Sequence, residues 1–249
     1  MKLQTAAAAG AIFAAAISVF SANASAATAP APDKAAVEKI VHDYLMSHPE
    51  ILTDMQNALD AKQEAADQKA RTDALAKVGR AALTDPTVAF VTGPADAKVT
   101  VAEFFDYRCV HCKASLEAMK KAVATDSKVR FSFIEFPILT ADSLVAARAA
   151  VAARRQPGKY VPFHVALMAT SGDLPKERIL AIAKSSGLDV AKLAKDMDDP
   201  AVTATIDASH ALAQKLHVDG TPTFVINGQF WVGELTDAKL QSLIKAGET

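Results

Sequence analysis

Cysteine is almost absent from this sequence, whose 249 residues contain only Cys109 and Cys112. Stable disulfide frameworks in oxidising compartments usually join distant cysteines, so a pair three positions apart indicates chemistry rather than a structural cross-link. An attached haem would need histidine at position 113, where the chain has Lys113. A structural zinc site would need two further ligands, and no ligand spacing is found among His42, His48, His164, His210 and His217. We therefore expect neither a metal nor another cofactor.

The sequence also has no apolar run at its start long enough to span a bilayer, which takes ~20 residues. The apolar stretch over residues 6–20 follows the basic Lys2 and precedes the small residues 24–26. This layout is typical of a cleaved secretory signal, which we place at residues 1–26. No cysteine near the cleavage point offers a site for lipid attachment. We expect export to the periplasm as a soluble protein of 223 residues, since 249 − 26 = 223.

Excess charge is lacking as well. The net charge is −1 for the whole chain at pH 7 and becomes −2 once Lys2 leaves with the signal. Nothing in this balance indicates nucleic acid or an anionic membrane surface as a partner. The chain shows no internal repeat, and its length suits one large domain with an appendage.

The appendage is predicted to be a helical arm over residues 35–84, after a Pro-rich, flexible start at 27–34. Its first helix has an apolar face at the 3.6-residue period, formed by Val37, Ile40, Val41, Tyr44 and Leu45. A second helix opening at Pro49 has only alanines as apolar residues between Asp60 and Thr72. Such an arm either packs on the catalytic domain or assembles with copies of itself. We favour a homo-oligomer.

Residues 85–249 are predicted to form an α/β domain. Strand signals at 88–91 precede the nearly continuous apolar runs 99–105 and 131–136, which flank a helix that carries Cys112. This order predicts a right-handed parallel crossover. A helical insertion over about 141–217 follows, with helices expected at 144–155, 161–169, 176–185, 190–197 and 202–216. A hairpin is expected at 223–232 because Asn-Gly turns accept positive φ, and a last helix follows it.

The C-x-x-C pair falls where a strand ends and a helix begins. Unpaired N–H groups and the positive end of the helix dipole should stabilise a thiolate at Cys109, and His111 would add charge when protonated. Cys112, one turn further on, should be buried, keep a higher pKa and act as the resolving thiol. Stabilising the thiolate makes the disulfide more oxidising, so these residues predict thiol–disulfide exchange.

Two further features complete the predicted site. Glu103 is an acid in an otherwise apolar strand and could accept the Cys112 proton; the alternative is an ordinary strand-end carboxylate. Thr221-Pro222 precedes a strand, as an ordinary strand-entry proline would, but beside a C-x-x-C pair it predicts a cis peptide whose Thr221 backbone pairs with an extended substrate.

These features resemble the DsbA family of thioredoxin-fold proteins over about residues 86–247: Glu103-Phe-Phe, the C-x-x-C with His111, the helical insertion and Thr221-Pro222. The resemblance implies a thioredoxin-like fold with a helical insertion, exported cysteine-containing proteins as substrates and a membrane redox partner. It also implies roles at four positions: nucleophile Cys109, resolving Cys112, acid Glu103 and cis Pro222.

The arm, with Tyr44-Leu and His48-Pro49-Glu-Ile-Leu, is similar to the oligomerising arm of ScsC-type and related disulfide isomerases. Oxidases of the family typically have proline before the active-site histidine, where this chain has Val110, and threonine before the cis proline is common among isomerases. Both details favour isomerase or reductase use over a DsbA-like dithiol oxidase. A copper-binding protein that holds Cu(I) with two thiolates is the alternative from another class. We leave His164, Trp231 and the pair Arg154-Arg155 outside the predicted site as packing or surface residues.

Overall fold

The structure, a computed structural model, describes residues 33–126 and 128–248. The predicted signal segment, 1–26, and nearly all of the predicted flexible start, 27–34, lie outside the described residues. The described residues fall into two units, one that ends at residue 55 and one that begins at residue 56. In the part of the chain that the structure describes, no helix combines the length and the apolar character needed to cross a bilayer.

The described part of the first unit is helical. Helix α1 (Lys34–Ser47) begins where the Asp33 carboxylate accepts a hydrogen bond from the Ala35 N–H (3.3 Å). Every residue of α1 is exposed, including its predicted apolar face, of which Ile40 is 67% and Tyr44 56% exposed. The first turns of α2 (Glu50–Val78) follow Pro49 and add exposed Leu52 and Met55.

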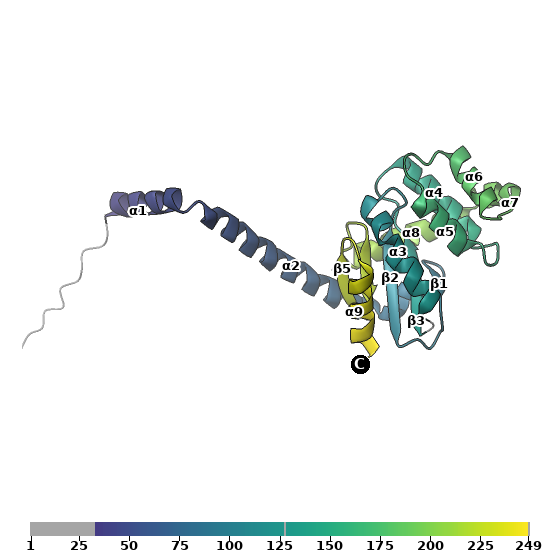
Figure 1. Ribbon diagram of the computed structural model, residues 1–249, viewed down its shortest axis with the longest axis horizontal. Coiled ribbons are helices and arrows are strands. Elements are labelled where there is room, and N and C mark those ends of the chain that lie inside the picture. Colours follow the sequence, from purple (N-terminus) through teal and green to yellow (C-terminus); the bar gives the residue numbers. More distant parts are fainter. Residues whose placement is uncertain (1–32, 127, 249) are drawn as a thin grey trace, which may run out of the picture. The chain divides into compact units, whose positions relative to one another are not determined.

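The second unit contains the rest of α2 and the remaining elements (Figure 1). These are η1 (Arg80–Thr84), β1 (Phe90–Thr92), β2 (Val99–Phe105), α3 (Val110–Thr125), β3 (Val129–Glu135), α4 (Ala141–Ala153), α5 (Tyr160–Ala169), α6 (Lys176–Ser185), α7 (Val190–Asp196), α8 (Pro200–Lys215), β4 (Thr223–Ile226), β5 (Gln229–Val232) and α9 (Asp237–Glu248). The predicted helices of the insertion agree with α4 to α8 within a few residues at each end. The predicted first strand lies slightly later in the chain, at β1.

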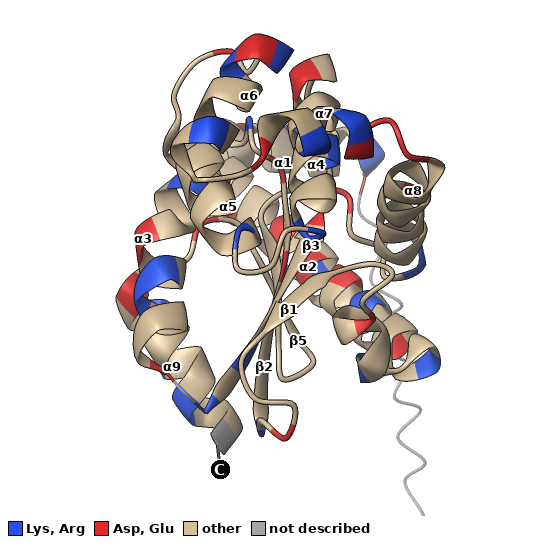
Figure 2. Ribbon diagram, turned by 90° about the vertical axis from the view of Figure 1, so that its right-hand side faces the viewer, with Lys and Arg blue, Asp and Glu red and all other residues tan. Residues whose placement is uncertain are grey.

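The strands form one mixed sheet in the order β1-β3-β2-β4-β5. β2 and β3 are parallel, as the predicted crossover requires, and the other pairs are antiparallel. The α/β class and the thioredoxin-like fold with a helical insertion are therefore confirmed. Acidic and basic residues are interspersed over the helices of this unit (Figure 2), which agrees with the small net charge of the chain.

Alternation along the strands divides the core between the two faces of the sheet. Val101 and Phe105 of β2 join α3, α9 and the insertion in one apolar cluster. Ala102 and Phe104 face the other way and join Leu75 and Leu83 with residues of α8. The end of α2 thus packs within the second unit, where Arg71 Nε also donates to the His217 carbonyl (3.1 Å). Only the earlier part of the predicted arm has an exposed apolar face.

Candidate active site

The two cysteines lie at the start of α3, four residues after β2 ends. Cys109 is the N-cap residue: its backbone is extended (φ −72°, ψ 119°) and its Sγ accepts a hydrogen bond from the Cys112 N–H (3.4 Å). The Cys109 N–H donates to the Asp106 carbonyl (3.1 Å), which closes the turn. Both thiols are free, and 5% of Cys109 and 2% of Cys112 are exposed. The sulfur of Cys109 therefore lies among the unpaired N–H groups of the helix.

This position stabilises a thiolate at Cys109. Hydrogen bonding from the Cys112 thiol, from the Thr221 side chain and from the backbone N–H groups of Cys112 and His111 lowers the pKa of Cys109 to about 5, and this outweighs the opposite effect of partial burial. The imidazole of His111 lies at the surface, with Nδ1 3.9 Å from Glu234 Oε2. His111 stabilises the Cys109 thiolate through its backbone N–H. The sequence had predicted stabilisation by the charge of its ring.

Cys112 has the opposite character. Burial raises its pKa above that of a free thiol, and the thiol of Cys109 and the charge of Glu103 raise it further. Glu103 is itself buried on β2, where burial first, and the charges of Cys109 and Glu135 next, raise its pKa to about 8. A carboxyl with this pKa can take up or release a proton near neutral pH, which suits the predicted role of Glu103 as acceptor of the Cys112 proton.

The Thr221-Pro222 peptide bond is cis, as predicted. It immediately precedes β4, which pairs with β2 through Phe104 and Thr223. The Cys109 thiol donates a hydrogen bond to the Thr221 carbonyl (3.2 Å), so a segment 112 positions away lies against Cys109. The fold thus brings together Cys109, Cys112 and Thr221-Pro222, with Glu103 on the strand behind them.

A buried polar cluster adjoins this site that the sequence did not reveal. Glu135 Oε1 accepts hydrogen bonds from Tyr160 (2.9 Å) and Tyr107 (3.4 Å), and the Tyr107 hydroxyl lies 3.1 Å from His164 Nδ1. Burial raises the pKa of Glu135 to about 8 and lowers that of His164 to about 3, so both are largely neutral. Within the described residues, Glu135 Oε2 and two nitrogens of Arg154 are buried without a hydrogen-bond partner. The one available signal was an acid inside the apolar run 131–136.

Comparisons with known proteins agree with this geometry. Residues 100–245 match the family model described as DSBA-like thioredoxin domain, and residues 33–66 match that of the copper resistance protein ScsC N-terminal domain. A thioredoxin-like oxidoreductase from Silicibacter pomeroyi DSS-3 is 43% identical, with a TM-score of 0.64 over 68% of this chain and 98% of that chain. Salmonella enterica Typhimurium BcfH is 29% identical, with a TM-score of 0.71 over 86% and 96%.

A variant of Proteus mirabilis ScsC is 26% identical, with a TM-score of 0.67 over 88% of this chain and 99% of that chain. Among curated proteins, the chain is 31% identical to Na(+)/H(+) antiporter NhaA 1 of Salinispora arenicola over 147 residues, 58% of this chain but 22% of the antiporter. It therefore spans about a quarter of the first curated relatives. Disulfide bond formation protein D of Bacillus subtilis is 28% identical over 55% of this chain and 67% of that protein.

Proposed function

Since the chain belongs to the family of DSBA-like thioredoxin domains, which its match over residues 100–245 shows, we propose that it is a periplasmic thiol–disulfide oxidoreductase acting on exported proteins that contain cysteine. One observation carries this proposal. Cys109 is the N-cap residue of α3, and its sulfur accepts a hydrogen bond from the Cys112 N–H. The same sulfur contacts the carbonyl of Thr221, the residue before the cis proline.

The geometry supports the following exchange. The Cys109 thiolate attacks one sulfur of a substrate disulfide, the substrate S–S bond breaks, and the departing substrate thiolate takes a proton from solvent. Cys112 then loses its proton to Glu103 and attacks the Cys109 sulfur of the mixed disulfide. The second substrate sulfur leaves as a thiolate and takes the proton from Glu103, and the protein holds the Cys109–Cys112 disulfide. The substrate gains the two electrons that the protein loses.

Isomerisation uses the same first step but returns the electrons. A second substrate thiolate attacks the substrate sulfur of the mixed disulfide, forms a new substrate disulfide and expels Cys109 as a thiolate. The low pKa of Cys109, about 5, makes it a good leaving group and favours the reduced protein. Val110, Thr221 and the exposed apolar face of α1 support isomerase or reductase use. A membrane redox partner would keep the pair reduced.

The distinguishing experiment uses scrambled, fully oxidised ribonuclease. We expect the protein without residues 1–26 to restore ribonuclease activity, and a variant also lacking residues 27–55 to be much weaker, because several active sites would no longer surround one substrate. Rapid oxidation of a reduced peptide by both proteins, with no recovery of ribonuclease, would show a dithiol oxidase instead.

Copper binding is the second candidate, favoured by the match of residues 33–66 to a domain named for copper resistance. The soft thiolates of Cys109 and Cys112 would hold Cu(I). Titration of the reduced protein with Cu(I) and a competing chelator tests this. Loss of binding in Cys109→Ser, together with inactivity in both redox assays, would favour copper handling over exchange.

A further inference from the structure

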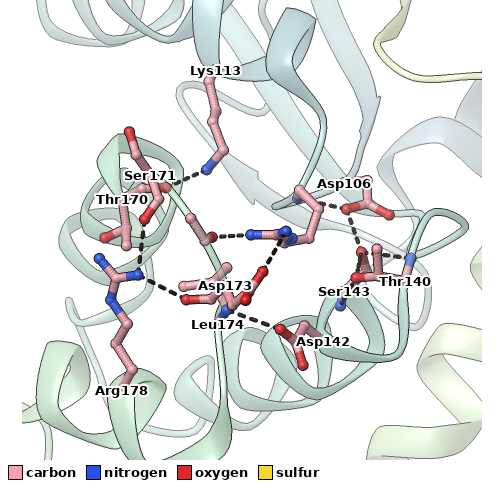
Figure 3. A network of polar contacts seen from close by, with 12 residues as sticks. Asp106, Lys113, Thr140, Asp142, Ser143, Thr170, Ser171, Asp173, Leu174 and Arg178 are labelled. Atoms are coloured by element: carbon pink, nitrogen blue, oxygen red, sulfur yellow. Dashed lines mark hydrogen bonds and ion pairs between the residues drawn. The ribbon is translucent and has the colours of Figure 1, made fainter.

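The loop between α5 and α6 is held by cations that come largely from the active-site segment. Lys113, directly after the C-x-x-C pair, donates to the Met168 carbonyl (3.1 Å) and the Thr170 carbonyl (2.7 Å). Arg108, directly before the pair, donates to the Gly172 carbonyl and bonds the Asp173 carboxylate (2.8 Å). Figure 3 shows the Lys113 side chain reaching from the start of α3 to this loop.

A third cation that holds the loop comes from α6, the helix that follows it. Arg178 of α6 donates to the carbonyls of Ser171 and Asp173, both at 2.8 Å (Figure 3). Carbonyl oxygens at the end of α5 and along the loop therefore turn toward three positive groups. Gly172 has a φ of +78°, which allows the chain to make this turn. Two of the three cations, Arg108 and Lys113, directly flank the cysteine pair in the sequence.

Lys113 lies between two sites of negative potential. One is the carbonyl end of α5, where the helix dipole is negative and a cation is stabilising. The other is the start of α3, where the Lys113 N–H donates to the Cys109 carbonyl (3.1 Å). Burial first, and Arg108 next, lower the pKa of Lys113, and the negative charge of a Cys109 thiolate opposes this. Asp106, on the turn before the pair, also favours the ammonium. The same cation thus interacts with a charge that exists only when the pair is reduced.

We infer that Lys113 is a positioning residue that couples the redox state of the Cys109–Cys112 pair to the order of the α5–α6 loop, residues 170–175. This inference rests on the proposed function. In the reduced protein the thiolate and the loop carbonyls hold the ammonium together. In the oxidised protein the thiolate charge is gone, and the carbonyls hold Lys113 alone. Coupling of this kind is reciprocal, so the held loop also favours the reduced pair.

The coupling gives the reduced and oxidised forms different surfaces beside the nucleophile. Leu174, near the end of the loop, donates its N–H to Asp142 Oδ2 (3.0 Å) and ties the loop to the first turn of α4 (Figure 3). A partner that touches residues 170–175 would therefore meet a more ordered loop on the reduced protein. An oxidoreductase needs such a difference, because its substrate and its reducing partner must each bind one redox form.

The first measurement needs no substitution. Hydrogen exchange of the full protein, followed by mass spectrometry, is compared between forms poised with glutathione buffers. We expect slower exchange in the 168–175 peptides of the reduced form, where the N–H groups of Thr170 and Leu174 are bonded. Exchange at the same rate in both forms would overturn the inference.

The second measurement is the equilibrium constant of the pair with glutathione, determined by trapping free thiols. In Lys113→Met the equilibrium constant should shift about threefold to tenfold toward the oxidised protein, because the thiolate loses a nearby positive charge. Lys113→Arg should restore most of it. Lys120→Met is the matched control, since Lys120 lies on the same helix and pairs with Glu117 (2.8 Å) instead.

A purely structural Lys113 would lower the stability of both redox forms equally and leave the constant unchanged, which would refute the coupling. If Lys113→Met does not fold, the exchange comparison of the unsubstituted protein decides alone. Failure of the proposed function looks different: the unsubstituted protein would then form no Cys109–Cys112 disulfide in any glutathione buffer.

Discussion

Glu103 of β2 and Glu135 of β3 lie on the same face of the sheet, because the parallel register pairs Glu103 with Phe133 and Phe105 with Glu135. Both carboxyls are buried, and the charge of Glu135 is among the causes that raise the pKa of Glu103. Two acids behind one cysteine pair therefore hold protons at a pH where exposed carboxyls are ionised. The first predictions follow from this relationship.

Replacing Glu103 should stabilise the protein in a pH-dependent way. Its pKa is about 8 in the fold and 4.5 ordinarily, so between these values the unfolded chain releases a proton that the folded protein keeps. The free energy of unfolding therefore falls as pH rises through this window. Glu103→Gln removes this loss of stability. Its free energy of unfolding should therefore exceed that of the unsubstituted protein by an amount that grows to about 2–4 kcal/mol by pH 8. Urea unfolding of the oxidised form at pH 5 and pH 8 measures it, with exposed Glu117→Gln as control.

The same substitution should slow catalysis. A mixed disulfide between Cys109 and a peptide is resolved by Cys112, whose proton Glu103 accepts in the proposed mechanism. Loss of a general base typically costs about 10²-fold or more, so Glu103→Gln should release the peptide that much more slowly at pH 7. Stopped-flow release of a fluorescent peptide tests this. Unchanged release would leave Glu103 with a structural role only.

Cys109 should react with alkylating agents far below the pH at which free thiols do. Its pKa is about 5, against ~8.5 for a free cysteine, so the iodoacetamide rate should rise through a midpoint near pH 5. Between pH 5 and ~8.5 the unfolded chain keeps the proton that folded Cys109 has lost, so the reduced form should gain stability over the oxidised form as pH rises. Cys112 should stay unmodified. A midpoint near pH 8.5 would contradict the hydrogen-bonded thiolate.

Much of this fold follows from the sequence, for identifiable physical reasons. Buried parallel strands need continuous apolar runs, and an Asn-Gly turn marks the hairpin, so β2, β3 and the β4–β5 pair were predictable. The position of the cysteine pair at a strand–helix junction likewise predicted thiol–disulfide exchange. Lys113 served only to exclude haem, because its carbonyl partners lie 55 and 57 positions away and are brought near by the insertion's packing. Glu135 was missed for the same reason, and His164 was left outside the predicted site as a packing or surface residue.

Glu135 should act on exchange through Glu103. Glu135→Gln keeps an oxygen for the Tyr160 hydroxyl. It removes the negative charge that Glu135 gains as it ionises near pH 8, and this charge raises the pKa of Glu103. The pH at which peptide release becomes half-maximal should therefore fall. In a Glu103→Gln background the second substitution should leave this profile unmoved, because no carboxyl remains to respond. A shift of the same size in both backgrounds would show that Glu135 acts independently.

The exposed apolar face of α1 should join copies of the chain. Ile40 is 67% exposed and Tyr44 56% exposed, and neighbours at helical spacing extend this face, an arrangement that an isolated helix in water does not favour. Ile40→Lys should lower the mass found by sedimentation equilibrium to that of one chain. Glu38→Lys introduces the same group at a position that already pairs with Lys34 (3.5 Å) outside the apolar face, and should leave assembly intact.

Ribonuclease reactivation should fall with assembly, whereas oxidation of a small peptide should persist, because Cys109 and Cys112 lie in the other unit. An Ile40→Lys protein of unchanged mass would remove the arm from the proposed isomerase mechanism.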